Sequence, residues 1–360
     1  MLLWRGRRRT VETKLFLERE DLFDHYVAAH PRGDVLQTTA WGRVKQSTGW
    51  EAFPLGVMDR GRLQAAALVL AKRLPYIPAV LAYSPRGPLY SSGEALAHLL
   101  QGGTKFLREQ GALVWKMDPA IPEADPTWLE AARSQGLKQV ETGLDFDGVQ
   151  PRHVMTLSLN HSLDTLLANM KQKTRYNIRY AMRKNVTVQA LKEKSQLGVF
   201  YCLLQETAKR DRFTIRSLDY FEAIWDHLVQ AGLARVFLAY HEETPLAGAI
   251  CFRLGPRVWY VYGASSSEKR NLQAPHLIQW EMIKWAKGAG CTIYDFRGVS
   301  GDLRPEHPLY GLYRFKEGFG ATLETYVGEF DLPIRQGGYA LWLGGLRMHN
   351  WIRRYKRQAH

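Results

Sequence analysis

The stretch that decides the fold is residues 274–296, which read APHLIQWEMIKWAKGAGCTIYDF. Apolar residues recur at helical spacing up to residue 288 and leave little polar face, so we expect a helix that packs on both sides. Gly290 follows this helix, and residues 292–296 form an apolar strand that contains Asp295. The stretch therefore predicts a helix covering a sheet, with an acidic residue near the end of one strand.

The same order of elements occurs twice. In the second half, two strands, the helix and a third strand lie at 246–253, 258–262, 274–288 and 292–296. In the first half, the matching elements lie at 63–70, 80–83, 94–110 and 113–117, with Asp118 directly after the last strand. The copies lie about 180 positions apart, and a period this long indicates a duplicated domain.

Strands that alternate with helices predict an α/β (α+β) protein with mixed sheets flanked by helices. The strand–strand–helix–strand order is that of the GCN5-related acyltransferase (GNAT) fold, so we expect two tandem GNAT-like domains. A chain of 360 residues with 46% hydrophobic residues is long enough to bury two cores.

Charge and cysteine content limit the classes of partner. The formal net charge is +14, of which eight charges lie in the first nine and last eight residues, leaving 14 − 8 = +6 for the middle. A polyanionic partner is expected: nucleic acid, anionic lipid or a phosphorylated substrate. Three scattered cysteines predict a reducing cytoplasm and no metal site, and no apolar run reaches the length of a membrane span.

A phosphate-binding loop of the acetyl-CoA type is missing. GNAT enzymes hold the pyrophosphate of that donor on backbone N–H groups at a helix start, in a glycine-containing loop. In the matching loop, 270–275, Gln273 stands where the first glycine belongs and Pro275 has no N–H. The first half has no such loop before Glu94. We therefore expect no coenzyme A and no other cofactor.

Residues 298–319 form a Gly/Pro-rich loop that leads into an aromatic run around Lys316. Between Phe315 and Phe319 this lysine would lie in a partly dry setting, suited to phosphates or to the oxyanion of an acyl transfer. The alternative is a solvated lysine on a helix.

The chain resembles the Fem (FemA/FemB/FemX) family of non-ribosomal peptidyltransferases, which build the interpeptide bridges of bacterial peptidoglycan. The resemblance covers nearly the whole chain and rests on the order and spacing of QTTAWGRVK (37–45), SPRGP (84–88), KMDP (116–119), residues 207–213, YVYGASS (260–266), YDFRG (294–298) and FKEGFG (315–320). No long heptad segment is present, so the chain resembles the FemX-like type without a coiled-coil arm.

This resemblance implies a cytoplasmic monomer that moves an aminoacyl group from aminoacyl-tRNA to the stem-peptide amine of lipid II or of UDP-MurNAc-pentapeptide. It also implies that the last segment returns to the first domain. We place the first domain at 1–151, completed by 327–360, and the second at 152–326.

The resemblance assigns roles at the acceptor side. Lys45 and Arg216, with Tyr220, match positions that bind the phosphates and sugar of the cell-wall precursor. Tyr260 and Tyr262 match positions in the same channel, and the strand period of two predicts that they share one face. Each has a structural alternative, a surface cation or a core tyrosine.

Further roles concern the chemistry. Phe315 and Lys316 match the pair that meets the tRNA acceptor end and steadies charge in the transition state. Asp118 matches an acidic position that contacts the acceptor amine or acts as base, with an Asp-Pro turn cap as an equal alternative. Arg210 and Arg212 compete with the assigned arginine for the phosphate.

A basic stripe lies at residues 171–184. Arg175, Arg179 and Arg183 are four apart and predict one helix face, with Tyr176 and Tyr180 beside it. Such a face suits an RNA backbone, here tRNA, or precursor phosphates. A solvated helix face is the alternative.

Two further functions and one further contact remain open. The chain could be a coenzyme-A-dependent N-acyltransferase of duplicated GNAT fold, or a non-catalytic RNA- or membrane-binding protein. The apolar and basic tail at 339–358 either lies on the anionic inner face of the membrane or forms a buried final helix. The histidines, His276 among them, show no ligand spacing and are interpreted as structural.

Overall fold

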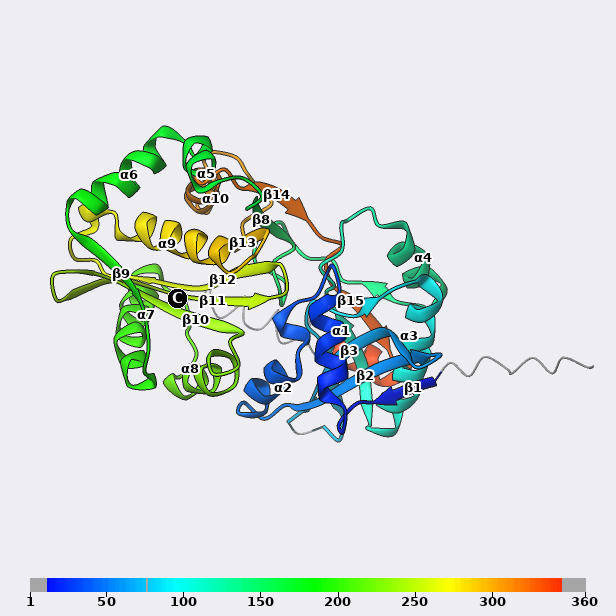
Figure 1. The fold of residues 1–360 in the computed structure, drawn as a ribbon. Helices are drawn as coiled ribbons and strands as arrows, with labels where there is room; N and C mark the ends of the chain where they lie inside the picture. The colour runs from blue at the N-terminus through cyan, green and yellow to red at the C-terminus, as the bar shows by residue number, and fades with distance from the viewer. Residues whose placement is uncertain (1–11, 76, 345–360) are drawn as a thin grey trace, which may run out of the picture. The chain divides into compact units, whose positions relative to one another are not determined.

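The structure, a computed structural model, describes residues 12–75 and 77–344. The chain folds into two compact units, each with a mixed sheet and its own helices (Figure 1). Of the described residues, unit 1 holds those up to Arg32, those between 49 and 141 and those from Val327 onward, and unit 2 holds residues 33–48 and 142–326. The predicted fold class is confirmed.

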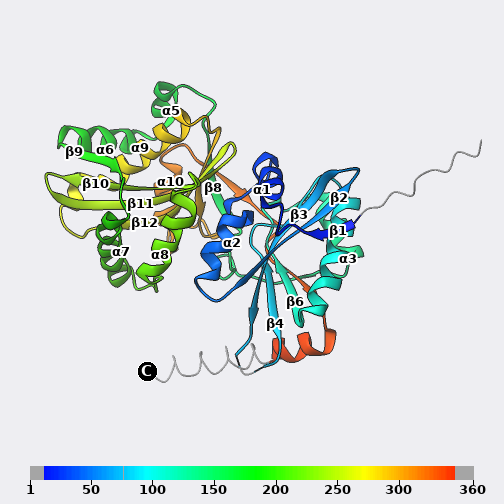
Figure 2. The ribbon, with the colours of Figure 1, turned by 60° about the horizontal axis from the view of Figure 1, so that its bottom comes forward.

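Unit 1 is built on an eight-stranded sheet in the order β1-β2-β3-β4-β6-β15-β7, with β5 beside β3. Its strands are β1 (Glu12–Leu15), β2 (Glu51–Asp59), β3 (Arg62–Arg73), β4 (Val80–Ser84), β5 (Leu89–Tyr90), β6 (Ala112–Met117), β7 (Lys138–Gln139) and β15 (Phe330–Pro333). Its helices are α1 (Glu20–Ala29), α3 (Gly93–Glu109) and α4 (Pro126–Ser134). Helix α3 packs against β1, β2 and β6, and α1 against β2 and β3 (Figure 2).

Unit 2 is built on a seven-stranded sheet in the order β14-β8-β13-β12-β11-β10-β9. Its strands are β8 (His153–Ser158), β9 (Val186–Ala190), β10 (Ala234–His241), β11 (Thr244–Leu254), β12 (Arg257–Ser265), β13 (Ile293–Gly298) and β14 (Thr322–Thr325). Its helices and helical turns are η1 (Val35–Gln37), α2 (Thr39–Gln46), α5 (Leu163–Asn169), α6 (Gln172–Arg183), η2 (Lys194–Gln196), α7 (Leu197–Asp211), α8 (Leu218–Ile224), η3 (Trp225–Val229), η4 (Arg270–Leu272), α9 (Ala274–Gly288) and α10 (Tyr310–Glu317).

The two sheets share one topology. In each, three antiparallel strands (β2-β3-β4 and β10-β11-β12) lead through a helix to a parallel neighbour, β6 or β13. The next place is taken by β8 in unit 2 and by β15 in unit 1. Because β15 comes from the far end of the chain, unit 1 is completed only after unit 2 has been traversed.

Apolar faces explain these layers. Helix α9 covers one face of the second sheet while α7 and α8 cover the other (Figure 1). Leu277, Met282 and Ile283 of α9 are buried, as the two-sided apolar pattern predicts. In unit 1, Trp115 on β6 and Trp128 on α4 are fully buried in the core.

One segment of the first half belongs to the second unit. Residues 33–48 carry α2, whose Trp41 packs edge-on against Phe252 of β11 with ring centres 5.9 Å apart. The carboxylate of Asp34 lies 3.9 Å from the guanidinium of Arg297 on β13. The predicted first domain, 1–151, is wrong for this segment because these contacts join positions more than 200 residues apart, which no local pattern reveals.

No helix in the described part of the chain is long and apolar enough to cross a bilayer, and none extends as a coiled-coil arm. Most of the basic tail proposed to contact membranes lies outside the described residues. Its beginning is described: Tyr339 is buried and donates a hydrogen bond to Asp331 at 3.0 Å.

A close approach of helix and sheet in unit 1 gives the first prediction. A methyl group at Gly103 of α3 would lie 2.5 Å from the ring of Trp115, which is buried and hydrogen-bonded to Ser84. Gly103→Ala should therefore lower the free energy of unfolding by about 1–3 kcal/mol. Gly288→Ala is the control, because its methyl group would meet nothing within 4 Å. Equal denaturant midpoints for the two variants would contradict this packing.

Candidate active site

Unit 2 brings four of the predicted substrate-binding residues together, and we call Lys45, Arg216, Tyr220 and Tyr262 the Tyr220 cluster. The Lys45 ammonium lies 5.8 Å and the Arg216 guanidinium 5.6 Å from the centre of the Tyr220 ring. The Tyr262 hydroxyl donates to that of Tyr220 at 3.4 Å. Burial raises the pKa of Tyr220, so its hydroxyl stays protonated. Two cations beside two hydroxyls can bind a diphosphate.

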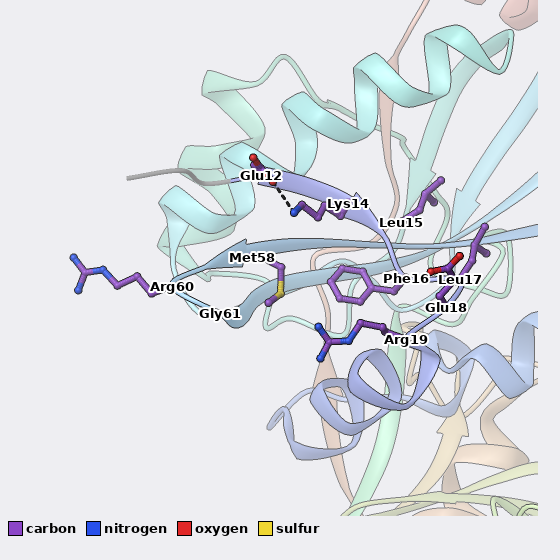
Figure 3. Close-up of a pocket in the computed structure, with 10 residues that line it drawn as sticks. All are labelled: Glu12, Lys14, Leu15, Phe16, Leu17, Glu18, Arg19, Met58, Arg60 and Gly61. Atoms are coloured by element: carbon purple, nitrogen blue, oxygen red, sulfur yellow. Dashed lines mark ion pairs between the residues drawn. The ribbon is translucent and has the colours of Figure 1, made fainter. Parts of the chain in front are cut away.

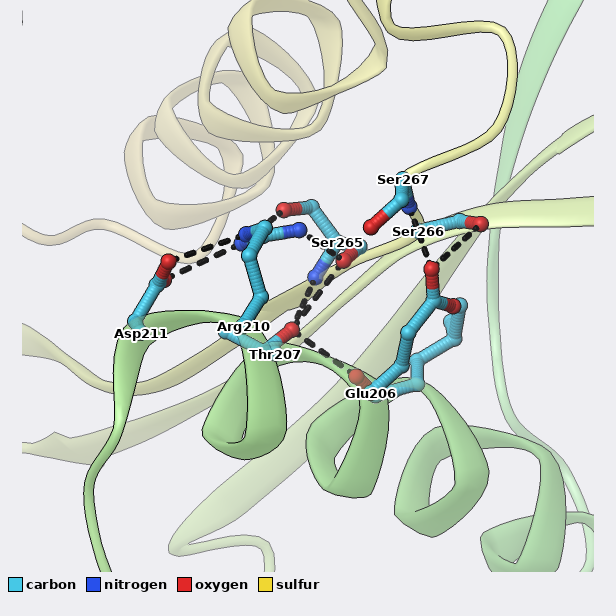
Figure 4. Close-up of polar contacts among 8 residues, drawn as sticks. Glu206, Thr207, Arg210, Asp211, Ser265, Ser266 and Ser267 are labelled. Atoms are coloured by element: carbon cyan, nitrogen blue, oxygen red, sulfur yellow. Dashed lines mark hydrogen bonds and ion pairs between the residues drawn. The ribbon is translucent and has the colours of Figure 1, made fainter.

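A hydrogen-bond clamp from α7 holds the end of β12, the strand that carries Tyr262 (Figure 4). The Thr207 hydroxyl accepts from the backbone N–H of Ser265 at 2.8 Å, and Arg210 donates to the carbonyl of Ser265 at 2.9 Å. Glu206 accepts from the N–H of Ser267 at 2.5 Å. Arg210 is thereby committed to the backbone, which removes it as a competitor for a phosphate.

A β-bulge separates the two tyrosines of β12. The register shifts between Ile250 and Cys251, so Tyr262 lies opposite Ile250 and Tyr260 opposite Cys251. Paired residues share a face and neighbours alternate. Tyr262 therefore points toward α8, whereas Tyr260 points toward α9 and hydrogen-bonds with Gln279 there. The prediction that both tyrosines share one face is wrong because the bulge adds one residue between them.

The parallel strands of unit 2 separate at their carboxyl ends. Pairing between β12 and β13 stops at Trp259 and Asp295, although β12 continues to Ser265 and β13 to Gly298. In unit 1 the corresponding strands β4 and β6 stay paired to the end of β4, at Ser84 and Met117. The sheet of unit 2 thus has an unpaired stretch at which groups from its two faces can meet.

Lys316 occupies this stretch. The residue lies on α10 and is 4% exposed, and its ammonium donates to the carbonyl of Gly298 at 2.6 Å. Burial lowers the pKa of Lys316 to about 7; nearby Asp295 opposes the shift, and Arg297 adds to it. The partly dry setting expected from the sequence is confirmed. A lysine with this pKa can act as a cation or exchange a proton near neutral pH.

A left-handed turn fixes the carbonyl that Lys316 contacts. Arg297 has φ +62°, and its backbone N–H donates to the carboxylate of Asp295 at 2.6 Å. Burial raises the pKa of Tyr262 and lowers that of Lys316, and the positive charge of Arg297 opposes the first shift and adds to the second. Arg297 is not among the site residues predicted from the sequence, although its place in the YDFRG motif, two residues after Asp295, was an available signal.

Phe315 and His276 form the wall shared by two clefts of about 410 and 450 Å³. Their ring centres are 5.1 Å apart, and the amide of Asn177 hydrogen-bonds with His276 Nε2 at 3.2 Å. Burial lowers the pKa of His276 to about 4, so its imidazole is neutral at pH 7. The sequence interpretation of His276 as structural overlooked this exposure to the clefts, because spacing alone does not show which face of α9 lines a cleft.

Asp118 lies in unit 1 and is enclosed. Its carboxylate accepts from the Tyr83 hydroxyl at 2.5 Å and from the backbone N–H of Arg86 at 2.6 Å. Burial raises its pKa to about 7, although Arg86 and these hydrogen bonds act against the shift. With both oxygens engaged and the residue 2% exposed, the geometry favours the turn-holding alternative for Asp118.

The predicted arginine stripe on α6 divides into two parts. Arg175 donates to the carbonyls of Ala168 and Met170 at the end of α5, so it serves as a cap for that helix. Arg179 and Arg183 are exposed. Of the three arginines, these two are available to a ligand.

Unit 1 has a hollow of about 570 Å³ along β1 and the β2–β3 turn (Figure 3). Phe16, Arg19, Met58 and Arg60 are among its lining residues. None of the predicted site residues lines it, and we do not assign the reaction to this hollow.

This fold and site define a transferase of the tandem GNAT type, and comparisons with known proteins identify the family. The model of the FemAB family matches residues 18–242 and 230–343, and the chain belongs to that family. The lipid II:glycine glycyltransferase of Staphylococcus aureus (strain USA300) is 30% identical over an alignment of 389 positions, which covers 88% of this chain and 92% of that protein.

Solved structures agree with this assignment. The crystal structure of FemX superposes with a TM-score of 0.84 at 28% identity, covering 92% of this chain and 99% of that chain. A tandem GNAT protein from the clavulanic acid biosynthesis pathway has a TM-score of 0.53 at 12% identity over 90% of this chain and 99% of its own, which shows the fold alone. The enzyme class of the present chain is aminoacyltransferase.

The pKa of Lys316 gives a prediction about stability. An unfolded lysine binds its proton below about pH 10.5, whereas the buried one binds it only below about 7. Between these values the unfolded state holds more protons, so the free energy of unfolding should rise with pH. Relative to Lys316→Met, the rise should be on the order of 1 kcal/mol per pH unit.

The measurement is urea denaturation of both proteins at several pH values between 7 and 10. Lys284→Met is the control, because Lys284 is more exposed and pairs with Glu281 at 2.7 Å. A difference between the native protein and Lys316→Met that stays flat across this range would show that Lys316 remains charged in the folded state.

Proposed function

We propose that the protein transfers an aminoacyl group from aminoacyl-tRNA to the stem-peptide amine of a peptidoglycan precursor, lipid II or UDP-MurNAc-pentapeptide. The observation that carries this proposal is the arrangement at the unpaired end of β12 and β13. The Tyr220 cluster lies toward the α8 face of the sheet, the Phe315 clefts lie on the α9 face, and buried Lys316 reaches Gly298 at the end of β13. Family membership and relatives named for lipid II and glycine support the same substrates.

The chemistry is aminolysis of an ester. The acceptor amine attacks the ester carbonyl, a tetrahedral oxyanion forms, and the bond to the ribose oxygen breaks while the amine loses a proton. Protonated Lys316 neutralises the oxyanion and passes its proton to the departing ribose oxygen, for which a pKa of about 7 is suitable. The neutral lysine then takes up the proton that the amine loses, which restores its protonated form. No covalent enzyme intermediate is needed, because the donor ester is already activated.

The Tyr220 cluster binds the precursor in this proposal. Both candidate acceptors carry a pyrophosphate. Lys45 and Arg216, which both contact the Tyr220 ring, supply two cations that can bind this pyrophosphate. Phe315 stacks against the end of the donor RNA, in a cleft that includes Lys173 and Arg314. The cytoplasmic side of the membrane, where both substrates occur, is the expected location.

The start of α9 supports a donor other than coenzyme A. Gln273 precedes this helix in a left-handed conformation, with φ +60°. Pro275 lacks an N–H, and the N–H groups of His276 and Leu277 both bond to the carbonyl of Gln273. Few donors therefore remain for a pyrophosphate at the place where GNAT enzymes bind one.

The test of the proposed function is a transfer assay. Purified protein is incubated with glycyl-, alanyl- or seryl-tRNA and with each precursor, and the products are weighed by mass spectrometry. We expect one aminoacyl mass to be added, and Lys316→Met to lower kcat by about 10²–10³-fold with unchanged tRNA binding. Lys284→Met serves as the control. Transfer from acetyl-CoA, with none from any charged tRNA, would overturn the proposal.

A second prediction isolates the phosphate contact. Arg216→Ala should raise the KM for UDP-MurNAc-pentapeptide about tenfold or more, since a charge-assisted contact is lost, and should leave the KM for aminoacyl-tRNA unchanged. The matched control is Arg212→Gly, in the same loop, since glycine retains the backbone φ of +56°. The increase in the acceptor KM of Arg216→Ala should vanish when the acceptor is a peptide without the pyrophosphate. A defect of equal size for that peptide would place Arg216 elsewhere in the mechanism.

A further inference from the structure

Helix α6 carries two stacked tyrosines, of which Tyr176 is exposed and Tyr180 is half-buried. The rings of Tyr176 and Tyr180 lie 5.9 Å apart at an angle of 23°, and Tyr176 is 56% exposed. The Arg183 guanidinium lies 6.0 Å from the Tyr176 ring, and the Lys184 ammonium 5.8 Å from the Tyr180 ring. An exposed aromatic ring stacked on a second ring offers a larger contiguous apolar surface than an isolated apolar residue does, and such surfaces mark interaction sites.

This face is strongly basic. Residues 171–184 contain six lysines and arginines and no acidic residue. Lys171 pairs with Glu317, and Arg175 caps α5. Among the residues that the structure describes, Lys173, Arg179, Arg183 and Lys184 have no carboxylate within ion-pair distance. Like charges one turn apart destabilise a helix slightly, so an anionic partner would relieve their repulsion and is favoured at this face.

The face is continuous with one of the clefts. Residues of an α-helix advance by about 100° each, which places Lys173, Tyr176, Asn177, Tyr180 and Lys184 on adjoining positions of one side. Lys173 and Asn177 line the cleft of about 410 Å³ that also holds Phe315. A ligand chain that leaves this cleft along α6 therefore meets the stacked tyrosines next.

We propose that the exposed face of α6, formed by Lys173, Tyr176, Arg179, Tyr180, Arg183 and Lys184, binds the acceptor end of an RNA. The tyrosines stack with unpaired bases near its 3′ end, and the cations contact the flanking phosphates. This inference rests on the proposed function, because it identifies where the RNA donor is held. A duplex alone offers no base faces, so the tyrosines recognise the single-stranded end and the cations recognise both parts.

The test uses two fluorescent RNA hairpins with the same acceptor stem, one with a single-stranded NCCA end and one blunt. Binding is measured by anisotropy between 50 and 300 mM KCl. Tyr176→Ala/Tyr180→Ala should weaken binding of the NCCA hairpin about tenfold and leave the blunt hairpin within twofold. Arg179→Ala/Arg183→Ala should weaken both and lower the slope of log K against log salt by about 1.5–2.

Matched controls exclude trivial causes. Lys105→Ala/Arg108→Ala removes two exposed cations from α3 and should change neither hairpin. Thermal unfolding of each variant confirms that the altered surface residues leave the fold intact. In transfer assays, the tyrosine variant should raise the KM for charged tRNA about tenfold, with kcat and the acceptor KM within twofold.

The outcomes separate this inference from the function on which it rests. One outcome is that the native protein uses aminoacyl-tRNA while both α6 variants bind the hairpins and transfer the aminoacyl group as well as the native protein does. In that case the assigned surface is wrong and the proposed function stands. If the native protein binds neither hairpin and uses no charged tRNA, the function itself fails. If α6 instead holds vesicles of phosphatidylglycerol and no RNA, the partner is a membrane and the inference is overturned.

Discussion

The separation of β12 from β13 beyond Trp259 and Asp295 is the constraint on which the candidate site depends. While the strands are paired, their hydrogen bonds seal the sheet and keep its faces apart. Beyond that point the end of each strand needs other partners, and the structure supplies them. The clamp from α7 holds Ser265, and the Asp295–Arg297 turn holds the end of β13. Lys316 then reaches the carbonyl of Gly298.

The two units share one sheet topology but differ in how far their parallel strands stay paired. In unit 1 the parallel strands stay paired to Ser84 and Met117, and Asp118 directly after them is enclosed by Tyr83 and the Arg86 backbone. In unit 2 the equivalent strands open, and the acidic residue Asp295 supports a turn beside a buried lysine. The open pair leaves space at which groups from both faces of the sheet can meet, and the proposed chemistry is therefore placed in unit 2.

Local patterns in the sequence were sufficient to predict the helices and strands whose apolar residues recur at a regular spacing. The helix predicted at 274–288 has those bounds, and the predicted strands and helices of both copies match β3, β4, α3, β6, β11, β12 and β13 closely. Composition around Phe315 and Phe319 also indicated that Lys316 would be dry. Patterns failed where one residue changes the register, since the bulge in β12 turns Tyr260 away from Tyr262.

The sequence by itself determined the duplication, the apolar faces and the residue types of the site, because these depend on spacing along the chain. Tertiary structure decided that α2 joins unit 2, that Arg175 caps a helix while Arg183 stays exposed, and that Arg297 lies within electrostatic reach of both Tyr262 and Lys316. Each of these depends on contacts between distant segments, whose energies arise from burial and charge and leave no periodic trace in the chain.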